Sequence, residues 1–221
     1  GLDLYEGEGH FTGSKTIEVN GTTLQSDRIF IATGSRPCIP NVPGLDTVEC
    51  LTTESLLNLT VPPRSLAILG GGYIGVEYAH FFSAMGTSVT LIEAADRLVV
   101  GEEPEIAALL LRALRTRMQV LTNTEVERID RGLRDIRLLV RERGSGARFS
   151  VAADTVMLAT GRCSNADLLG VEKAGIKTDA RGYILVDEYM QTNVPGIYAI
   201  GDANGKYMFR HIANIEASLA A

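Results

Sequence analysis

A cluster of glycines between two hydrophobic stretches limits most strongly what this chain can fold into. Ser65–Leu69 is a short apolar run that leads directly into Gly70-Gly71-Gly72-Tyr73-Ile74-Gly75, and a stretch with helical spacing then continues to Ala84. A G-x-G-x-x-G spacing at a strand-to-helix turn is typical of dinucleotide-binding βαβ units. Gly70 permits the tight turn, Gly72 lets the backbone approach a pyrophosphate, and Gly75 lets the helix pack closely on the strand.

The segments after this turn repeat the alternation of strand and helix. Ser88–Ile92 is a second apolar run, Pro104 begins a helical stretch that continues over Ile106–Arg117, and Met118–Leu121 is a third apolar run. Proline is favoured at the first position of a helix, and one face of this helix is apolar. The order β-α-β-α-β predicts an α/β fold with a doubly wound, Rossmann-like parallel sheet. Between residues 123 and 151, short alternating segments with polar turns predict an antiparallel β-meander.

A proline-rich connection, Arg36–Gly44, indicates a domain boundary, because proline suits neither a helix interior nor a central strand. It follows the apolar run Arg28–Thr33, and two later runs, Thr155–Thr160 and Gly196–Ile200, each end at a glycine. We therefore expect one complete domain over residues 46–162. Residues 1–45 and 163–221 are expected to form a second, incomplete domain of the same type.

Glu93 stands at the end of the second strand, 18 residues after Gly75. A carboxylate in that place can accept hydrogen bonds from both ribose hydroxyls of NAD, and it would repel the 2′-phosphate of NADP. Ala94 and Ala95 follow, and the first basic residue after them is Arg97, whereas a 2′-phosphate site would need an arginine beside the carboxylate. The pattern favours NAD. The alternative is a glycine-rich turn with an unrelated surface acid.

The composition argues against several classes of protein. With 21 Lys and Arg against 27 Asp and Glu, the formal net charge is −6, and the clustered cations that nucleic acid needs are not expected. No apolar run reaches the roughly 20 residues of a membrane span, and no secretory leader is recognisable. We therefore expect a cytoplasmic protein with neither nucleic-acid nor membrane partners. Cys38, Cys50 and Cys163 form no C-x-x-C or zinc pattern, so we expect isolated reduced thiols and no metal site.

Several further motifs occur in a specific order along the chain. They are Ile31-Ala32-Thr33-Gly34-Ser35, Gly70–Glu77 (GGGYIGVE), Ala159-Thr160-Gly161-Arg162, Ile200-Gly201-Asp202 and Met208-Phe209-Arg210-His211. On these motifs the chain resembles the FAD-dependent pyridine nucleotide-disulfide oxidoreductases over Leu4–Glu216, and its pattern is most similar to that of the dihydrolipoamide dehydrogenases. The resemblance implies that residues 46–162 are the NAD-binding domain. Residues 1–45 and 163–221 would be parts of the FAD-binding domain.

The resemblance also implies the cofactor contacts. The residues matched to NAD contacts are Gly70, Gly71, Gly72, Tyr73, Ile74, Gly75, Glu77, Glu93, Val126 and Gly161, and those matched to FAD contacts are Gly9, Thr33, Gly34, Ser35, Asp202, Met208 and His211. Asp202 would bind the ribityl chain of the flavin, and Tyr73 would cover the flavin until nicotinamide displaces it. Histidine is more often a packing residue than a catalytic one, so we assign no proton transfer to His211. Arg162 fits an ordinary surface position equally well.

Three parts of the family pattern are absent from the sequence. No second G-x-G-x-x-G precedes Gly9, no C-x-x-x-x-C redox disulfide is present, and nothing follows Ala221, where the dimerisation domain with its catalytic histidine would come. We therefore interpret the chain as a fragment with no catalytic residue of its own, taken from a parent protein that is expected to be a homodimer.

By the resemblance, the parent would pass a hydride between NAD and FAD, and two electrons between FAD and a dithiol-disulfide pair. Dihydrolipoamide is the expected dithiol, favoured by the Met208-x-x-His211 spacing. Mercuric reductase, mycothione reductase and a flavin NADH oxidase are alternatives within the same fold. A nucleotide-binding module without catalysis is an alternative of a different class.

The absent glycine loop generates the first prediction. A helix N-terminus that holds the flavin pyrophosphate provides several hydrogen bonds to charged groups, each worth about 1.5–3 kcal/mol. Without it, the purified 221-residue chain should be colourless and should not reduce lipoamide with NADH, although it should bind NADH. Absorbance spectra of the purified chain measure the flavin content directly. A yellow preparation with about one flavin per chain would contradict this expectation.

Overall fold

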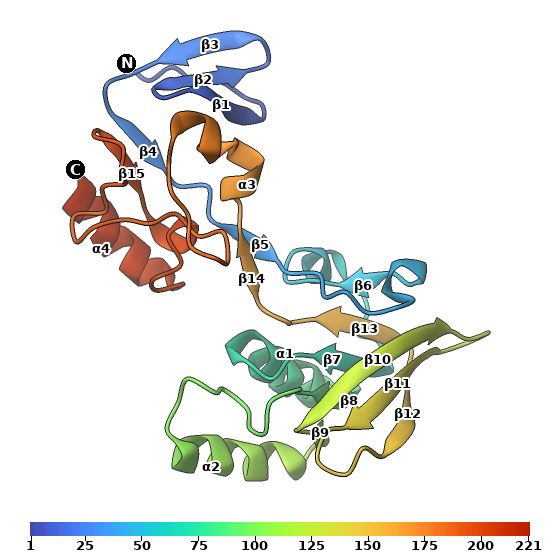
Figure 1. Ribbon diagram of the computed structural model, residues 1–221. Coiled ribbons are helices and arrows are strands. Elements are labelled where there is room, and N and C mark those ends of the chain that lie inside the picture. Colours follow the sequence, from blue (N-terminus) through green and yellow to red (C-terminus); the bar gives the residue numbers. More distant parts are fainter. The chain divides into compact units, whose positions relative to one another are not determined.

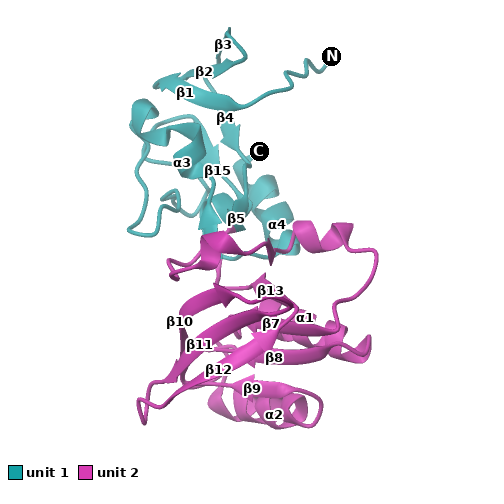
Figure 2. Cartoon of the chain, turned by 90° about the vertical axis from the view of Figure 1, so that its right-hand side faces the viewer, with its two compact units in different colours: residues 1–36, 162–221 teal, residues 37–161 magenta.

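The computed structural model describes residues 1–221, and they form two compact units (Figure 2). Residues 37–161 make up one unit, and residues 1–36 with 162–221 make up the other. The short strands β5 (Ser35–Pro37) and β14 (Arg162–Ser164) lie where the chain passes from one unit to the other. The first passage, between Arg36 and Pro37, thus lies at the start of the proline-rich connection. That connection packs within residues 37–161, where the Ile129 backbone N–H donates to the Pro43 carbonyl at 2.9 Å.

A five-stranded sheet forms the centre of residues 37–161 (Figure 1). Its strand order is β6-β13-β7-β8-β9, and the strands are β6 (Cys50–Leu51), β13 (Thr155–Leu158), β7 (Ser65–Leu69), β8 (Ser88–Ile92) and β9 (Gln119–Leu121). Every neighbouring pair is parallel. The predicted parallel sheet of an α/β fold is confirmed.

Different layers cover the two faces of this sheet (Figure 1). Helices α1 (Tyr73–Ala84) and α2 (Pro104–Arg115) pack on one face, where they meet Leu66 and Ile68 of β7. The intervening Ala67 and Leu69 point to the opposite face, because successive strand side chains alternate. An antiparallel sheet covers that second face. The apolar run of β7 is continuous because both of its faces are buried.

The antiparallel layer is the predicted β-meander. It consists of β10 (Thr124–Arg131), β11 (Ile136–Glu142) and β12 (Arg148–Ala153), paired in that order. Its inward side chains, among them Leu138 and Val140, are fully buried against the parallel sheet. Two 3-10 turns, η1 (Leu45–Thr47) and η2 (Ser55–Asn58), complete the unit.

The unit formed by residues 1–36 and 162–221 has less regular structure. Strands β1 (Gly9–Gly13), β2 (Thr16–Val19) and β3 (Thr22–Gln25) form an antiparallel sheet, and β4 (Ile29–Ile31) pairs in parallel with β15 (Ile197–Ala199). The short helices are α3 (Ala166–Leu169), η3 (Val171–Ala174) and η4 (Gly201–Ala203), and α4 (Arg210–Ala220) follows them. Phe11, Ile31 and Ile197 are buried in the core of this unit.

The cysteines depart from expectation. Neither Cys38 nor Cys163 is a free thiol, so the expectation of isolated reduced thiols is wrong for both. Cys50 is a free thiol, and burial raises its pKa to about 11. The helices are too short or too polar for any of them to span a bilayer.

The three-layer packing generates a stability prediction. Leu91 of β8 is fully buried on the face of the parallel sheet that packs against the helices. Leu91→Ala should lower the free energy of unfolding by about 2–5 kcal/mol, since the change removes buried carbon atoms and leaves a cavity. Leu133→Ala is the control: its side chain is fully exposed in the turn between β10 and β11, and the change should cost no more than about 0.5 kcal/mol. Denaturant titration followed by circular dichroism measures both. Equal losses would contradict this packing.

Candidate functional site

A cavity of about 450 Å³ opens at the carboxyl ends of β7, β8 and β13. Ligands of parallel α/β sheets bind at this edge, because the strand-to-helix turns there expose backbone amides. The cavity lies entirely within residues 37–161. Its lining residues are Pro40, Val42, Leu69, Gly70, Gly71, Gly72, Ile92, Glu93, Ala94, Ala95, Val99, Val100, Thr124, Glu125, Val126, Ala159, Thr160 and Gly161.

Three glycines shape the turn between β7 and α1, each for a different reason. Gly70 has φ +106°, and a Cβ there would lie 2.2 Å from the carbonyl oxygen of Ala159. A Cβ on Gly75 would lie 1.9 Å from the carbonyl oxygen of Gly70. At Gly72, by contrast, no atom comes within 4 Å of the added Cβ. Gly70 and Gly75 are therefore required for packing, whereas Gly72 leaves open space beside the backbone.

The first turn of α1 meets the cavity at Gly72, which is the N-cap residue of the helix. No side chain caps this helix end. Its backbone N–H groups and the positive end of the helix dipole are therefore available to an anion. The 12 residues of α1 make the dipole a substantial one.

Glu93 lines one end of the cavity, and two backbone N–H groups donate hydrogen bonds to its carboxylate. Its Oε2 accepts from the Gly71 N–H at 2.5 Å, and its Oε1 accepts from the Ala95 N–H at 2.6 Å. The backbone of Glu93 also pairs with Leu121 and Thr124. The carboxylate is thus held in a single orientation at the point where the sequence predicted a ribose ligand.

The loop after Glu93 forms part of the cavity lining, and the sequence analysis did not predict this. Val99 adopts φ +40°, which is uncommon for a β-branched residue, and its N–H donates to the Gly71 carbonyl at 2.9 Å. Leu98 is completely buried, and a Cβ on Gly71 would lie 2.5 Å from its Cδ2 atom. The apolar run Leu98-Val99-Val100 outside any helix or strand was the available signal.

The other residues matched to NAD contacts lie in different places. Val126 and Gly161 line the cavity, but Tyr73, Ile74 and Glu77 do not. Tyr73 is half exposed and donates its hydroxyl to Glu102 Oε1 at 2.5 Å, and this hydrogen bond raises the pKa of the tyrosine. Glu77 is exposed in a separate groove between α1 and α2.

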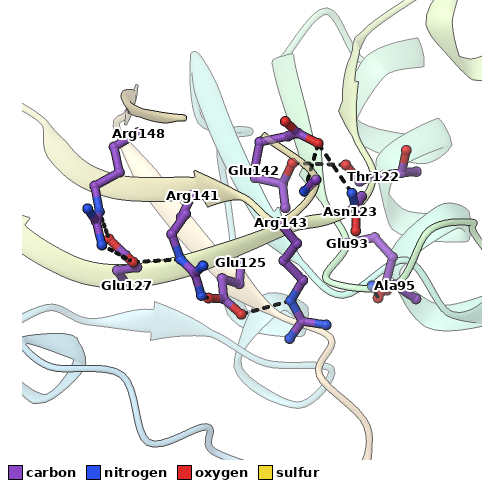
Figure 3. A network of polar contacts seen from close by, with 12 residues as sticks. Glu93, Ala95, Thr122, Asn123, Glu125, Glu127, Arg141, Glu142, Arg143 and Arg148 are labelled. Carbon is purple, nitrogen blue, oxygen red and sulfur yellow. Dashed lines mark hydrogen bonds and ion pairs between the residues drawn. The ribbon is translucent and has the colours of Figure 1, made fainter. Parts of the chain in front are cut away.

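A network of charged side chains lies on the β10–β11–β12 sheet beside the cavity (Figure 3). Glu125 accepts from Arg143 Nε at 2.8 Å and from Arg141, and these bonds, led by the one from Arg143, lower the pKa of the glutamate. Glu127 pairs with Arg148 at 2.7 Å and with Arg141 at 2.8 Å. Of these five residues, Glu125 alone lines the cavity.

In the other unit, the ends of β4 and β15 bring several of the residues matched to FAD together. Ser35 donates its hydroxyl to Asp202 Oδ2 at 2.6 Å. Gly34 has φ +66°, and the Thr33 carbonyl accepts from Asn165 Nδ2 at 2.8 Å. Thr33, Gly34, Ser35 and Asp202 therefore form one polar cluster, although Asp202 lies far from the other three in sequence.

Two charged residues that sequence reasoning left without a role support this cluster. Arg162 donates from Nε to the Ser35 hydroxyl at 2.6 Å and lies 3.5 Å from Asp202, so it is more than a surface residue. Glu216 is buried, and its carboxylate accepts from the Gly201 N–H at 2.6 Å and from Asn204 Nδ2 at 3.0 Å. The only signal for Glu216 in the sequence was its position as a glutamate on an otherwise apolar face of a helix.

The remaining residues matched to FAD lie outside this cluster. Gly9 belongs to β1, in the antiparallel sheet. Met208 is partly exposed, with its sulfur 3.8 Å from the Tyr183 hydroxyl. His211 is exposed and stacks on Phe209 with ring centroids 5.5 Å apart.

Comparison with known proteins gives the affiliation of the chain. Residues 1–217 match the family model for pyridine nucleotide-disulphide oxidoreductases. The chain is 35% identical to a mercuric reductase of Staphylococcus aureus, covering 100% of this chain and 40% of the relative, and 35% identical to a dihydrolipoyl dehydrogenase of Acholeplasma laidlawii, covering 100% and 64%. The solved structure of the HOCl-induced flavoprotein disulfide reductase RclA from Escherichia coli aligns with a TM-score of 0.88 at 32% identity, over 98% of this chain and 49% of that one. The chain therefore spans less than two thirds of each of these proteins.

The glycine geometry generates a matched pair of variants. Gly72→Val should leave the thermal unfolding temperature nearly unchanged, because its φ of −74° suits valine and the new side chain meets only open space. It should abolish pyridine-nucleotide binding, since that space lies where a phosphate would meet the helix amides. Gly75→Val should instead lower stability by about 3 kcal/mol through its clash with the Gly70 carbonyl. Thermal unfolding and NADH fluorescence titration separate the two effects. A folded Gly72→Val chain that binds NADH normally would place the ligand elsewhere.

Proposed function

Because the chain belongs to the pyridine nucleotide-disulphide oxidoreductase family, we propose that its cavity binds NAD(H) and that residues 37–161 are the NAD-binding domain of a flavoprotein disulfide reductase. One observation carries the proposal. The open backbone at Gly72 and the fixed carboxylate of Glu93 stand at the same cavity, so one dinucleotide can meet both.

The pyrophosphate lies against the N-terminus of α1, where Gly72 leaves room and the helix amides donate. The adenosine ribose then lies beside Glu93. A carboxylate has about four lone-pair sites, so Glu93 can accept from two ribose hydroxyls while it keeps its bonds to Gly71 and Ala95. Val126 and the apolar strand ends pack on the adenine side.

The charge of the cavity favours NAD over NADP. Glu93 and Glu125 are the charged residues of the lining, and no lysine or arginine is among them. Arg97, the nearest cation in sequence, donates to the Val100 carbonyl at 3.0 Å. A 2′-phosphate would therefore meet negative charge without an arginine to pair with it.

The polar cluster of the other unit is proposed to hold FAD, which supplies hydride acceptance and electron transfer to a disulfide when bound. The fit rests on donor chemistry: Asp202 and Ser35 present oxygens suited to the hydroxyls of a ribityl chain, and Arg162 keeps both in place. Gly9, Met208 and His211 remain candidate flavin contacts. The role of Tyr73 as a cover of the flavin that nicotinamide displaces stays a prediction.

For the parent protein we propose the NAD-linked oxidation of dihydrolipoamide through FAD and a redox disulfide, in a cytoplasmic homodimer. The 35% identity to the dihydrolipoyl dehydrogenase of Acholeplasma laidlawii supports this substrate. Mercuric reductase is the second candidate, because the identity to the Staphylococcus aureus enzyme is also 35%. Steady-state assays of the parent with lipoamide and with mercuric ion distinguish the two.

Glu93 generates the prediction that tests the nucleotide site. Glu93→Ala should weaken NADH binding by about 1–2 kcal/mol, the scale of a charge-assisted hydrogen bond. Glu93→Gln is the control, because its amide oxygen still accepts one bond. It should lose less NADH affinity and should improve NADPH binding relative to NADH. Fluorescence titration with both nucleotides measures these affinities. If the unaltered chain binds NADPH as tightly as NADH, the proposed NAD preference is wrong.

A further inference from the structure

A second carboxylate, Glu125, stands at the cavity, and the proposed function uses it only as part of the negative charge of the lining. Glu125 follows Thr124 at the start of β10, and its side chain is only 25% exposed. Partial burial destabilises the ionised form of a carboxylate unless nearby cations compensate for the hydration that it loses. Here two guanidinium groups do so.

Arg141 and Arg143 both direct their cations at Glu125 (Figure 3). Arg143 Nε lies 2.8 Å from Glu125 Oε2, and Arg141 pairs with Oε1. Arg141 also has Glu127 as a partner, whereas Glu125 is the ion-pair partner that the structure shows for Arg143. The side chain of Arg143 is 50% exposed, so it can reorient if Glu125 no longer holds it.

Arg143 lies near the Glu93 end of the cavity. Its backbone N–H donates to the Asn123 carbonyl at 2.8 Å, and the Asn123 N–H donates to the Ala95 carbonyl at 2.6 Å. Each such step spans about 5 Å between neighbouring backbones. Two such steps place the backbone of Arg143 no more than about 10 Å from that of Ala95, a cavity residue, and an extended arginine side chain covers most of that distance.

We propose that Glu125 is a specificity-determining residue: by holding Arg143 in an ion pair, it withholds from the Glu93 end of the cavity the cation that a 2′-phosphate would need. The inference rests on the proposed binding of NAD(H) in this cavity. A free arginine at that end could form a bidentate pair with a phosphate. Glu125 prevents this because its carboxylate holds the guanidinium of Arg143 in the ion pair. Discrimination against NADPH thus comes from the β-meander as well as from Glu93.

The test is a double-mutant cycle on the full 221-residue chain, with Kd for NADH and NADPH measured by fluorescence titration. Glu125→Gln keeps the shape of the side chain and removes its charge. It should lower the ratio of the NADPH Kd to the NADH Kd by about fivefold, and less at high salt, because exposed charges are screened. Arg143→Ala alone should leave the ratio within about twofold of its original value, since that arginine is already occupied. Adding Arg143→Ala to Glu125→Gln should cancel the gain.

Glu127→Gln is the matched control. Glu127 lies two residues along the same strand and also pairs with Arg141, but it does not line the cavity and does not contact Arg143. For Glu127→Gln, the ratio of the NADPH Kd to the NADH Kd should stay within about twofold of the ratio for the unaltered chain. Thermal unfolding of each variant confirms that it folds, and competition by adenosine 2′,5′-bisphosphate against adenosine 5′-monophosphate repeats the comparison at the adenosine end alone.

The outcomes separate this inference from the proposed function. If the unaltered chain prefers NADH but Glu125→Gln leaves the ratio unchanged, or if the gain survives Arg143→Ala, the role of Glu125 is overturned and NAD binding stands. An equal shift in Glu127→Gln overturns it as well. An unaltered chain that binds neither nucleotide overturns both.

Discussion

The contact between Gly75 and the carbonyl oxygen of Gly70 governs how closely α1 approaches β7. A single methyl group at position 75 would fall within 1.9 Å of that oxygen, so the helix can start where it does only because no side chain is present. The close start directs the first turn of α1 at the cavity and leaves Gly72 exposed there. The anion binding that we propose at this helix end would thus be a direct consequence of a backbone packing constraint.

Different layers cover the two faces of the parallel sheet, and each layer contributes differently to the cavity. Helices α1 and α2 bury Leu66 and Ile68 on one face, and this layer sets the direction of the helix dipole. The β10–β12 layer buries Ala67 and Leu69 on the other face. Because β10 begins directly beside Glu93, this second layer also delivers Val126 and Glu125 to the cavity. A layer that stabilises the sheet therefore also supplies part of the lining of the proposed nucleotide site.

Each proposed cofactor site relies on carboxylates that backbone amides or cations hold in place. Glu93 is fixed by the N–H groups of Gly71 and Ala95, and Asp202 is held by Ser35 and Arg162. Such partners restrict the orientation of a carboxylate before a ligand arrives, which reduces the entropy lost on binding. Glu216 acts on the backbone beside this carboxylate. It accepts a hydrogen bond from the N–H of Gly201, the residue directly before Asp202.

The sequence by itself determined the parallel sheet, its two helices and the glycine turn. The strands β7 and β8 and the end of α1 lie at the expected residues, because apolar runs and glycine spacing are local signals that each element carries within itself. The placement of Glu93 at the end of β8 followed from the same periodicity. Family motifs likewise marked Ser35 and Asp202 before their contact was known.

Only the tertiary structure decided which distant residues meet. Local patterns do not give the contact of the Val99 loop with Gly71 or the pairing of Arg143 with Glu125. The apolar run at Val99 and the glutamate at position 216 are local signals, but neither shows which residue is its partner. The support that Arg162 gives to Asp202 is likewise visible only in the structure. In each case the partners lie far apart in the chain and on different elements, so their side chains come together only when the strands pair and the layers pack. A pattern read along the sequence reports the periodicity of one element, whereas a charge network depends on the register between several.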